Sequence, residues 1–169
     1  MKYVSILLTA LFLFACSADP TPAPQLDLSG VNPITPRVDA QAVAEAAQLA
    51  DEETLALGEE VYNANCASCH GAEGEGQFPN NPMQPDETGR IGAPPHTSAG
   101  HTWHHPDQLL IQIIREGSNA PQDMFYPMPA FGDQLSDEEI VAVLEFIKTW
   151  WSEDERRVQA ERTLMTEQQ

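Results

Sequence analysis

The sequence Cys-Ala-Ser-Cys-His at residues 66–70 constrains the fold of this chain more than any other feature. Two cysteines that are two residues apart and directly followed by histidine form the attachment motif of a c-type haem. The thiols of Cys66 and Cys69 can add to the two vinyl groups of the haem, and the imidazole of His70 can reach the iron. The motif therefore predicts one covalently bound haem c, around which the rest of the chain must fold.

A pair of cysteines at this spacing also occurs in redox dithiols and in zinc sites. A thioredoxin-like dithiol needs a βαβ context, and no strand-like run surrounds Cys66 and Cys69. A structural zinc site needs two more cysteines or histidines at matched spacing. The chain has three cysteines in all, so a second pair does not exist. Haem attachment is the interpretation that the rest of the chain supports.

The amino terminus has the pattern of an export signal. Lys2 gives a short positive start, and residues 4–15 are nearly all apolar but too few to span a bilayer. The run ends in Leu-Phe-Ala-Cys, which resembles the lipobox of bacterial lipoproteins, where cleavage leaves a lipid-modified cysteine first. We therefore predict a lipoprotein-type signal peptide over residues 1–15 and lipidation of Cys16. The alternative is an ordinary secretory signal with an incidental cysteine.

The cysteine count agrees with a lipid anchor, because two cysteines for haem and one for lipid leave no unexplained thiol in an exported chain. Several acyl chains on Cys16 hold a protein at a membrane stably, whereas one chain alone is marginal. We expect an extracytoplasmic protein that is anchored to a membrane without spanning it. The location is the periplasmic face in a Gram-negative bacterium, or the outer face of the cell membrane.

The chain is strongly acidic, with 26 Asp and Glu against 8 Lys and Arg and a net charge of −18 at pH 7. Such a charge argues against a nucleic-acid partner. It favours protein partners with basic docking surfaces and an association that is sensitive to salt. The other interpretation is that the acidity keeps an exposed protein in solution.

Composition divides the mature chain into three parts. Residues 17–38 contain five prolines and few large apolar groups. We therefore predict residues 16–50 as a disordered, lipid-anchored, Pro/Ala-rich tether that ends in a short Ala-rich helix. Residues 51–152 have the size of one domain and are predicted to hold the haem. Residues 153–169 are a charged tail, helical or frayed, to which no function is assigned.

Hydrophobic periodicity predicts three main helices, and hence an all-α fold. The first covers residues 52–63, with Gly58 where another helix needs to approach closely. The second begins at Pro106, a favourable first helical residue, and stops at Gly117. Residues 71–105 form a long Gly- and Pro-rich loop, which needs a large apolar body such as haem to wrap around.

The third helix has the clearest start. Ser136 and Glu139 form the capping-box pattern, and Leu135 can staple onto Ile140. Apolar residues then recur at helical spacing for about three turns. We expect this helix to cross the first one, with its aromatic side chains over Gly58.

Three sequence features occur together in one known family. They are the haem motif at 66–70, Tyr-Pro-Met-Pro-Ala-Phe at 126–131, and the pattern Gly-x-x-x-Tyr at 58–62 on the first helix. With them, residues 51–151 resemble the class I mono-haem cytochrome c family. The resemblance implies the cytochrome c fold, with three main helices and long loops around one covalently bound haem. It also implies an electron carrier rather than an enzyme.

The resemblance also implies the iron ligands. His70 Nε2 is the proximal ligand in this pattern, and the sulfur of Met128 is the distal one. A thioether favours reduced iron, so such a pair raises the potential and fills the sixth position. Met124 is the runner-up for the distal position, and Met83 lies in the long loop. The family usually places a proline carbonyl against the other nitrogen of the proximal histidine, which implies Pro94 here.

The remaining histidines depart from the family pattern. His96 stands where the family often has leucine, either exposed or as a polar group near the haem edge. The segment His-Thr-Trp-His-His at 101–105 has three interpretations. In the first, the segment is a polar entry to the second helix. In the second, Trp103 Nε1–H and an imidazole such as that of His104 form hydrogen bonds to a haem propionate. In the third, its histidines form a second metal site with His96, for example for copper. A histidine of this segment can also replace Met128 on the iron.

We therefore expect a membrane-tethered carrier that passes single electrons from a donor to an acceptor redox protein. The alternative is a haem enzyme or a ligand or metal sensor, peroxidase-like, that uses a labile sixth site or the histidine cluster. A third interpretation has the same chemistry but makes the chain the cytochrome subunit of a larger respiratory or copper-handling complex.

Overall fold

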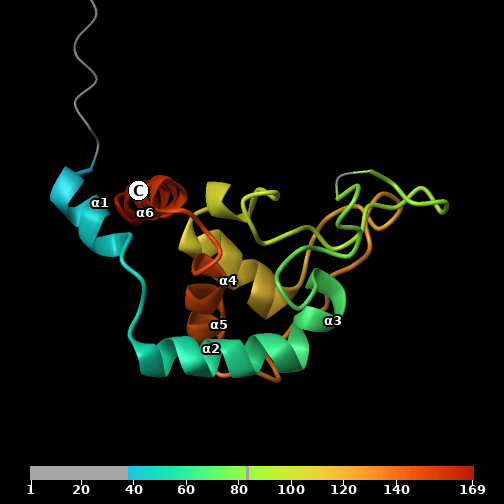
Figure 1. Ribbon diagram of the computed structural model, residues 1–169, viewed down its shortest axis with the longest axis horizontal. Coiled ribbons are helices and arrows are strands. Elements are labelled where there is room, and N and C mark those ends of the chain that lie inside the picture. The colour runs from blue at the N-terminus through green and yellow to red at the C-terminus, as the bar shows by residue number, and fades with distance from the viewer. Residues whose placement is uncertain (1–37, 83) are drawn as a thin grey trace, which may run out of the picture. The chain divides into compact units, whose positions relative to one another are not determined.

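The computed structural model describes residues 38–82 and 84–169, and within them the fold is entirely helical (Figure 1). The all-α prediction is therefore confirmed. The described residues include no helix that is long and apolar enough to cross a membrane. The predicted signal peptide, Cys16, most of the tether and Met83 lie outside the described residues. The helices in chain order are α1 (Ala40–Ala46), α2 (Glu52–Asn65), α3 (Ala67–His70), the 3₁₀ helix η1 (Thr102–His104), α4 (Asp107–Glu116), α5 (Asp137–Lys148) and α6 (Glu153–Glu167).

Side chains that bond to free backbone N–H groups set where α2 and α5 begin. Asp51 Oδ1 accepts a hydrogen bond from Thr54 N at 2.9 Å, so α2 begins at the predicted residue. At α5, Ser136 Oγ accepts from Glu139 N at 3.2 Å, and Glu139 Oε2 accepts from Ser136 N at 2.8 Å. These two bonds are the reciprocal pair of a capping box, which confirms the predicted start of the third main helix.

The start of α4 differs from the prediction by one residue. Pro106 precedes the helix instead of opening it, because its backbone is extended with ψ at 155°. Its carbonyl still accepts a hydrogen bond from Leu110 N at 3.2 Å. The predicted stop is at the right place, where Gly117 takes a φ of 83° that side chains rarely tolerate.

Helices α2 and α5 cross at Gly58, as expected from the sequence. A Cβ atom on Gly58 would overlap the carbonyl oxygen of Ala142 and would lie 2.8 Å from Phe146 Cβ. The absence of a side chain at this position is therefore what lets the two backbones meet. Aromatic rings cover the crossing, with Tyr62 5.7 Å from Phe146 and 4.9 Å from Trp150 between ring centroids.

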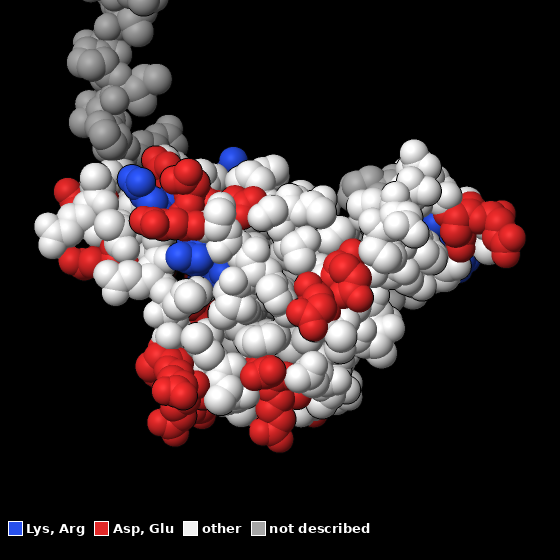
Figure 2. All heavy atoms as spheres, viewed as in Figure 1, with Lys and Arg blue, Asp and Glu red and all other residues white. Residues whose placement is uncertain are grey.

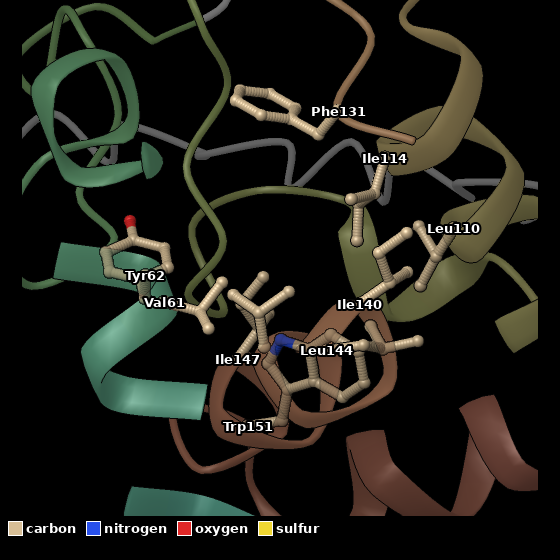
Figure 3. Packing of buried hydrophobic residues seen from close by; sticks show 10 residues of the cluster. Val61, Tyr62, Leu110, Ile114, Phe131, Ile140, Leu144, Ile147 and Trp151 are labelled. Atoms are coloured by element: carbon tan, nitrogen blue, oxygen red, sulfur yellow. The ribbon is translucent and has the colours of Figure 1, made fainter. Parts of the chain in front are cut away.

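The core lies on the side of α5 that faces α2 and α4. Figure 3 shows side chains of α5 gathered between those of α2 and those of α4, with Phe131 reaching in from the loop before α5. Tyr62 is fully buried and its hydroxyl donates to the carbonyl of Gly71 at 2.8 Å, so the core is bonded directly to the end of the haem motif. The buried members of this cluster are Val61, Tyr62, Leu110, Ile114, Phe131, Ile140, Val143, Leu144, Ile147 and Trp151.

The charged segment after Ser152 forms α6, so of the two expectations for the tail the helical one is correct. A second capping box opens it, with Ser152 as the cap and Glu155 as its partner. Apolar contacts of Val43 and Ala47 with Ala160 join α1 to α6 (Figure 1). The ordered helices thus continue on both sides of the segment 51–152 that the sequence predicts as the haem domain.

Polar side chains that are buried hold α6 on the entry to α4. Gln159 is 2 % exposed, and the two hydrogens of its amide are shared among three acceptors: Asp107 Oδ1, Thr163 Oγ1 at 3.1 Å and the carbonyl of His105 at 3.3 Å. Thr163 Oγ1 also accepts from Asp107 N at 3.0 Å. Because η1 lies directly before this point, α6 supports the segment that carries Trp103.

Candidate haem site

The cysteine–histidine motif forms a single helical turn that continues α2. Cys66 both ends α2 and opens α3, with its N–H donating to Tyr62 O at 2.8 Å and its carbonyl accepting from His70 N at 2.9 Å. Both thiols are free, Cys66 half-buried and Cys69 exposed. Burial, and secondarily the neighbouring Cys69, raises the pKa of the Cys66 thiol to about 11. Both sulfurs and the imidazole of His70 are therefore presented from one short turn.

His70 is held in the form that binds a metal. Its side chain is buried, and Nδ1 lies 2.9 Å from the carbonyl oxygen of Pro94, which can only accept. Nδ1 therefore carries the proton, and the lone pair of Nε2 is free for a metal ion. Burial lowers the pKa of His70, and the hydrogen bond to Pro94 opposes this only in part, which favours the neutral imidazole. Pro94 is the acceptor that the sequence analysis named.

Tight backbone contacts fix the carbonyl of Pro94. Gly76, with φ at 83°, lies so close to the loop that a Cβ atom there would be 2.8 Å from Pro95 N. Its N–H donates to His70 O at 2.7 Å, and the next residue donates from Gln77 N to Ala93 O at 2.9 Å. The loop therefore cannot move away from His70 without breaking several backbone hydrogen bonds.

The methionine loop is bonded to the end of α4. Ser118 N donates to Met128 O at 3.1 Å, and Phe131 N donates to Ile114 O at 3.0 Å. Met128 is half-buried against the main core cluster, whereas Met124 is 53 % exposed. Of the two candidates for a distal ligand, Met128 has the more enclosed side chain.

Trp103 provides the test of whether these residues fit a haem. Its ring packs on the main core cluster, and among the described residues its Nε1 is the buried side-chain donor without a hydrogen-bond partner. A buried indole N–H normally has an acceptor, and leaving one unpaired costs about 1–3 kcal/mol. A haem propionate is an acceptor of the right kind. The site therefore fits a covalent haem at three kinds of group: two thiols, an imidazole with a free Nε2, and an unpaired indole donor.

Comparison with known proteins decides the family. The family model described as cytochrome c oxidase, cbb3-type, subunit III matches residues 53–147, which is more than half of the chain and spans α2 to the end of α5. This chain is a class I mono-haem c-type cytochrome.

Relatives of the cytochrome include several cytochromes c6. That of Gracilaria tenuistipitata var. liui is 31 % identical over 100 residues, which cover 59 % of this chain and 76 % of the relative. The chloroplastic cytochrome c6 of Chlamydomonas reinhardtii is 29 % identical over 134 residues, or 79 % and 77 % of the two chains. The gluconate 2-dehydrogenase cytochrome c subunit of Pantoea cypripedii is 32 % identical over 98 residues, but these cover only 20 % of that protein. No solved structure matches the chain significantly.

The predicted fold, cofactor and general function of the cytochrome are thereby confirmed. It has the cytochrome c fold, carries one covalent haem c, and transfers electrons with other redox proteins as partners. The match ends at residue 147, so α6 lies outside the part of the chain that the family model covers.

His96 is not exposed, so the first of its two expected placements is wrong, and it makes a contact that sequence reasoning did not predict. Its ring stacks on that of His70 at a centroid distance of 4.1 Å and an interplanar angle of 21°. Burial lowers the pKa of His96 well below its ordinary value, and the neighbouring His70 and His101 add to this effect. The signal available in the sequence was its place in the loop that holds the proximal histidine, two residues after Pro94.

The histidines of the segment 101–105 do not form the second metal site that was one of the three interpretations of this segment. Within residues 38–82 and 84–169, no three His, Cys, Asp or Glu side chains are arranged to hold a metal ion. His101 and His105 meet edge to face at 5.4 Å, and the ring of His104 packs on Trp103 at 3.7 Å. His96, the expected further ligand, is turned toward His70 instead. The copper interpretation is therefore wrong for these residues.

Proposed function

We propose that this cytochrome is a membrane-tethered carrier of single electrons whose iron is held by His70 and Met128. The observation that carries the proposal is the 2.9 Å contact between His70 Nδ1 and the Pro94 carbonyl, because it leaves Nε2 as the only ligand atom of a buried imidazole. Haem supplies a one-electron couple between ferrous and ferric iron. Cys66 and Cys69 attach it, and the exposure of Cys69 makes this edge the natural docking face for redox partners.

Met128 is the proposed distal ligand because its side chain is enclosed against the main core cluster, whereas that of Met124 is exposed. A thioether stabilises the reduced state and occupies the sixth position, which keeps substrates away from the metal. The chain then acts as a carrier and catalyses no reaction of its own. Trp103, with the adjacent ring of His104, is proposed to bind a haem propionate.

A spectroscopic redox titration of wild-type protein and Met128→Ala tests the ligand set. We expect the wild type to be six-coordinate and low-spin in both redox states, and to show the charge-transfer band of methionine on ferric iron. Met128→Ala should lose this band and have a lower reduction potential. Met124→Ala is the matched control, because an exposed methionine should leave both measurements unchanged. If Met124→Ala loses the band and Met128→Ala keeps it, the assignment is reversed.

Carbon monoxide distinguishes the carrier from a haem enzyme or sensor. A firmly bound Met128 should prevent carbon monoxide from binding to the ferrous wild type, while Met128→Ala, with its sixth position open, should bind it. Rapid binding by the wild type, together with turnover of peroxide, would favour the enzyme instead.

The proposed membrane anchor is lipid on Cys16, on the extracytoplasmic side. Support comes from the apolar run that ends at Cys16 and from the cysteine count, in which haem accounts for the other two. Expression of wild type and Cys16→Ser with membrane fractionation tests it. We expect the wild type in the membrane fraction, released by detergent and not by high salt, and the variant in the soluble exported fraction. A haem-loaded wild type that is found entirely in the soluble fraction contradicts the anchor.

Subunit membership in a larger complex is a second candidate. The matching family is described as a subunit of a cbb3-type oxidase, and one relative is the cytochrome subunit of a dehydrogenase. Affinity isolation from mildly solubilised membranes tests this. A stoichiometric partner set supports a fixed subunit, whereas isolation of the cytochrome alone supports a carrier that meets donor and acceptor in turn.

A further inference from the structure

The loop that follows the haem motif contacts the proximal histidine twice. Pro94 accepts the hydrogen bond from His70 Nδ1. The ring of His96 stacks on the ring of His70, with a centroid distance of 4.1 Å and an interplanar angle of 21°. A single hydrogen bond fixes one atom of an imidazole but leaves the ring able to turn about that contact. A flat ring stacked on its face removes this freedom as well.

The backbone of His96 is held at both ends. Its N–H donates to Gly74 O at 2.8 Å, and its carbonyl accepts from Trp151 Nε1 at 2.7 Å. Trp151 is a buried member of the main core cluster. The position of His96 is therefore coupled to the segment that directly follows α5 and to the turn after the haem motif.

The ring of His96 is also fixed in orientation. Its Nδ1 lies 3.0 Å from Thr102 Oγ1, and this hydroxyl oxygen lies 3.4 Å from Pro95 O. Thr102 is buried, and its hydroxyl can either donate to His96 Nδ1 or accept from it. In both cases the bond between Nδ1 and Oγ1 fixes the orientation of the His96 ring.

We propose that His96 is a positioning residue that fixes the plane of the His70 imidazole by stacking on it, with Thr102 holding the stacked ring in place. The proposal rests on the proposed ligation of iron by His70. The plane of an axial imidazole decides how its π orbital overlaps the iron d orbitals, and hence how unpaired spin is distributed over the haem in the ferric state. A branched aliphatic side chain, such as the leucine of the family pattern, has no flat face to give this constraint.

The experiment uses the full haem-loaded chain and three variants: His96→Leu, His96→Phe and Thr102→Val. Paramagnetic NMR of the ferric protein measures the hyperfine-shifted haem methyl resonances, and electron paramagnetic resonance measures the g values. We expect His96→Leu to change the spread of the methyl shifts and broaden the g signals. His96→Phe keeps a flat ring and should restore a spread close to wild type. Thr102→Val keeps the side-chain volume but frees the stacked ring, so it should broaden the signals without loss of haem.

Two results overturn the proposal: wild-type methyl shifts and g values in His96→Leu, or equal disturbance in His96→Phe and His96→Leu. If His96→Leu does not load haem, Thr102→Val decides alone, and an unchanged spectrum in that variant overturns the proposal. Failure of the proposed function has a different signature. In that case the wild type itself lacks the low-spin spectrum of an axial imidazole, whatever the variants do.

Discussion

At the residue scale, the geometry depends on positions where a backbone approaches too closely for any side chain. Gly58 lets α5 rest on α2, and Gly76 lets the loop at Pro94 press against the turn after the haem motif. The two positions act at different distances from the site. Gly58 sets the packing of the two longest core helices, while Gly76 sets the carbonyl that orients His70.

We expect Gly58→Ala to destabilise the protein although alanine is the better helix former. The added Cβ would overlap Ala142 O, and relieving the overlap requires the helices to separate. Overpacking of this kind costs about 1–3 kcal/mol. Denaturant unfolding followed by circular dichroism measures it. Glu60→Ala, at an exposed site of the same helix, is the control and should change stability little. An unchanged unfolding midpoint for Gly58→Ala would mean that α2 and α5 can move apart at little cost in free energy.

We expect Trp103→Phe to lower the reduction potential by some tens of millivolts while the protein remains folded. The variant keeps an aromatic ring in the core but removes the indole N–H that has no partner among the described residues. Without this donor, the negative charge of the propionate is less well balanced by hydrogen bonds. That charge then stabilises ferric iron relative to ferrous iron, which lowers the potential. Redox titration measures the shift. A potential equal to that of wild type would show that Nε1–H does not reach a propionate.

At the element scale, α4 and α5 are joined by an ion cluster that is largely buried. Lys148 Nζ lies 2.9 Å from Asp107 Oδ2 and 2.7 Å from Glu145 Oε1, and the lysine side chain is 7 % exposed. Burial alone would lower the pKa of Lys148, but the two carboxylates outweigh it and raise that pKa. The attraction is therefore present at neutral pH and is lost only as pH rises above the ordinary range of lysine.

We expect Lys148→Met to destabilise the protein by about 3–5 kcal/mol, because two carboxylates then remain in a half-buried place without their cation. The matched control is Arg115→Met. Arg115 Nη2 lies 2.7 Å from Asp137 Oδ1, a shorter contact than that of Lys148 with Asp107, but its side chains are 45 % and 87 % exposed. An exposed pair contributes about 0–1 kcal/mol. Thermal or denaturant unfolding measures the loss of stability in each variant. If Arg115→Met and Lys148→Met lose the same amount, burial does not decide how much these ion pairs contribute.

Two loops on the methionine side are joined by a short pairing. Ile91 N donates to Met124 O at 2.8 Å, and Tyr126 N donates to Ile91 O at 3.0 Å. The Tyr126 hydroxyl also donates to Asp86 Oδ2 at 2.8 Å. Hydrogen bonds from the Thr88 hydroxyl and then from Tyr126 lower the pKa of Asp86 from 3.8 to about 2. The carboxylate form thus ties the two loops together.

The sign of the pH effect follows from this lowered pKa. The contribution of Asp86 to stability is present above its ordinary value of 3.8 and is lost as pH falls toward about 2. We expect Tyr126→Phe to raise the pKa of Asp86, and Thr88→Val to raise it further because the hydroxyl of Thr88 is the larger cause. NMR titration of the Asp86 carboxyl carbon measures both. If the pKa of Asp86 is the same in Tyr126→Phe as in the wild type, the tyrosine does not lower it.

Local patterns predicted the elements and, through Gly58, the crossing of α2 and α5, but other contacts between distant residues were not predicted. The capping box at Ser136 involves two residues that are three positions apart, so the residue types at these positions are enough to predict where α5 begins. The stack of His96 on His70 spans a long loop that has no periodicity, and η1 and α6 meet through Gln159, a residue type that is usually exposed. Pro94 could be named only through the family resemblance, since no local rule selects one proline among neighbours.

At the scale of the whole molecule, charge is the dominant property. The net charge is −18, and Figure 2 shows acidic side chains spread over the visible face with few basic ones between them. Glu73 and Glu75 lie in the turn that directly follows the haem motif, and both are exposed. A field of one sign around the site steers charged partners and is screened by salt, with a Debye length of about 10 Å at 0.1 M.

The charge predicts opposite salt effects for reaction partners of opposite charge. Reduction of the ferric protein by the hexaammineruthenium(II) cation should slow as sodium chloride is added, and oxidation of the ferrous protein by the ferricyanide anion should become faster. Stopped-flow kinetics measure the rate constant for each reagent as a function of ionic strength. Because each reagent is compared only with itself, the difference in driving force between the two reagents does not affect the two slopes. Steering of this kind changes rates by about 10- to 1,000-fold between low and high salt.

Two single neutralisations show which charges matter. Glu73→Gln, beside the motif, should flatten both slopes, whereas Glu167→Gln should leave them as in wild type, because it is on α6, which lies on the opposite side of the molecule from α3 in Figure 1. The effect of a charge falls within about one Debye length, so only acids near the haem edge can act on a reagent that reacts there. Flat slopes in the wild type, or equal effects of the two variants, would mean that the acidity serves solubility and does not direct partners to the haem.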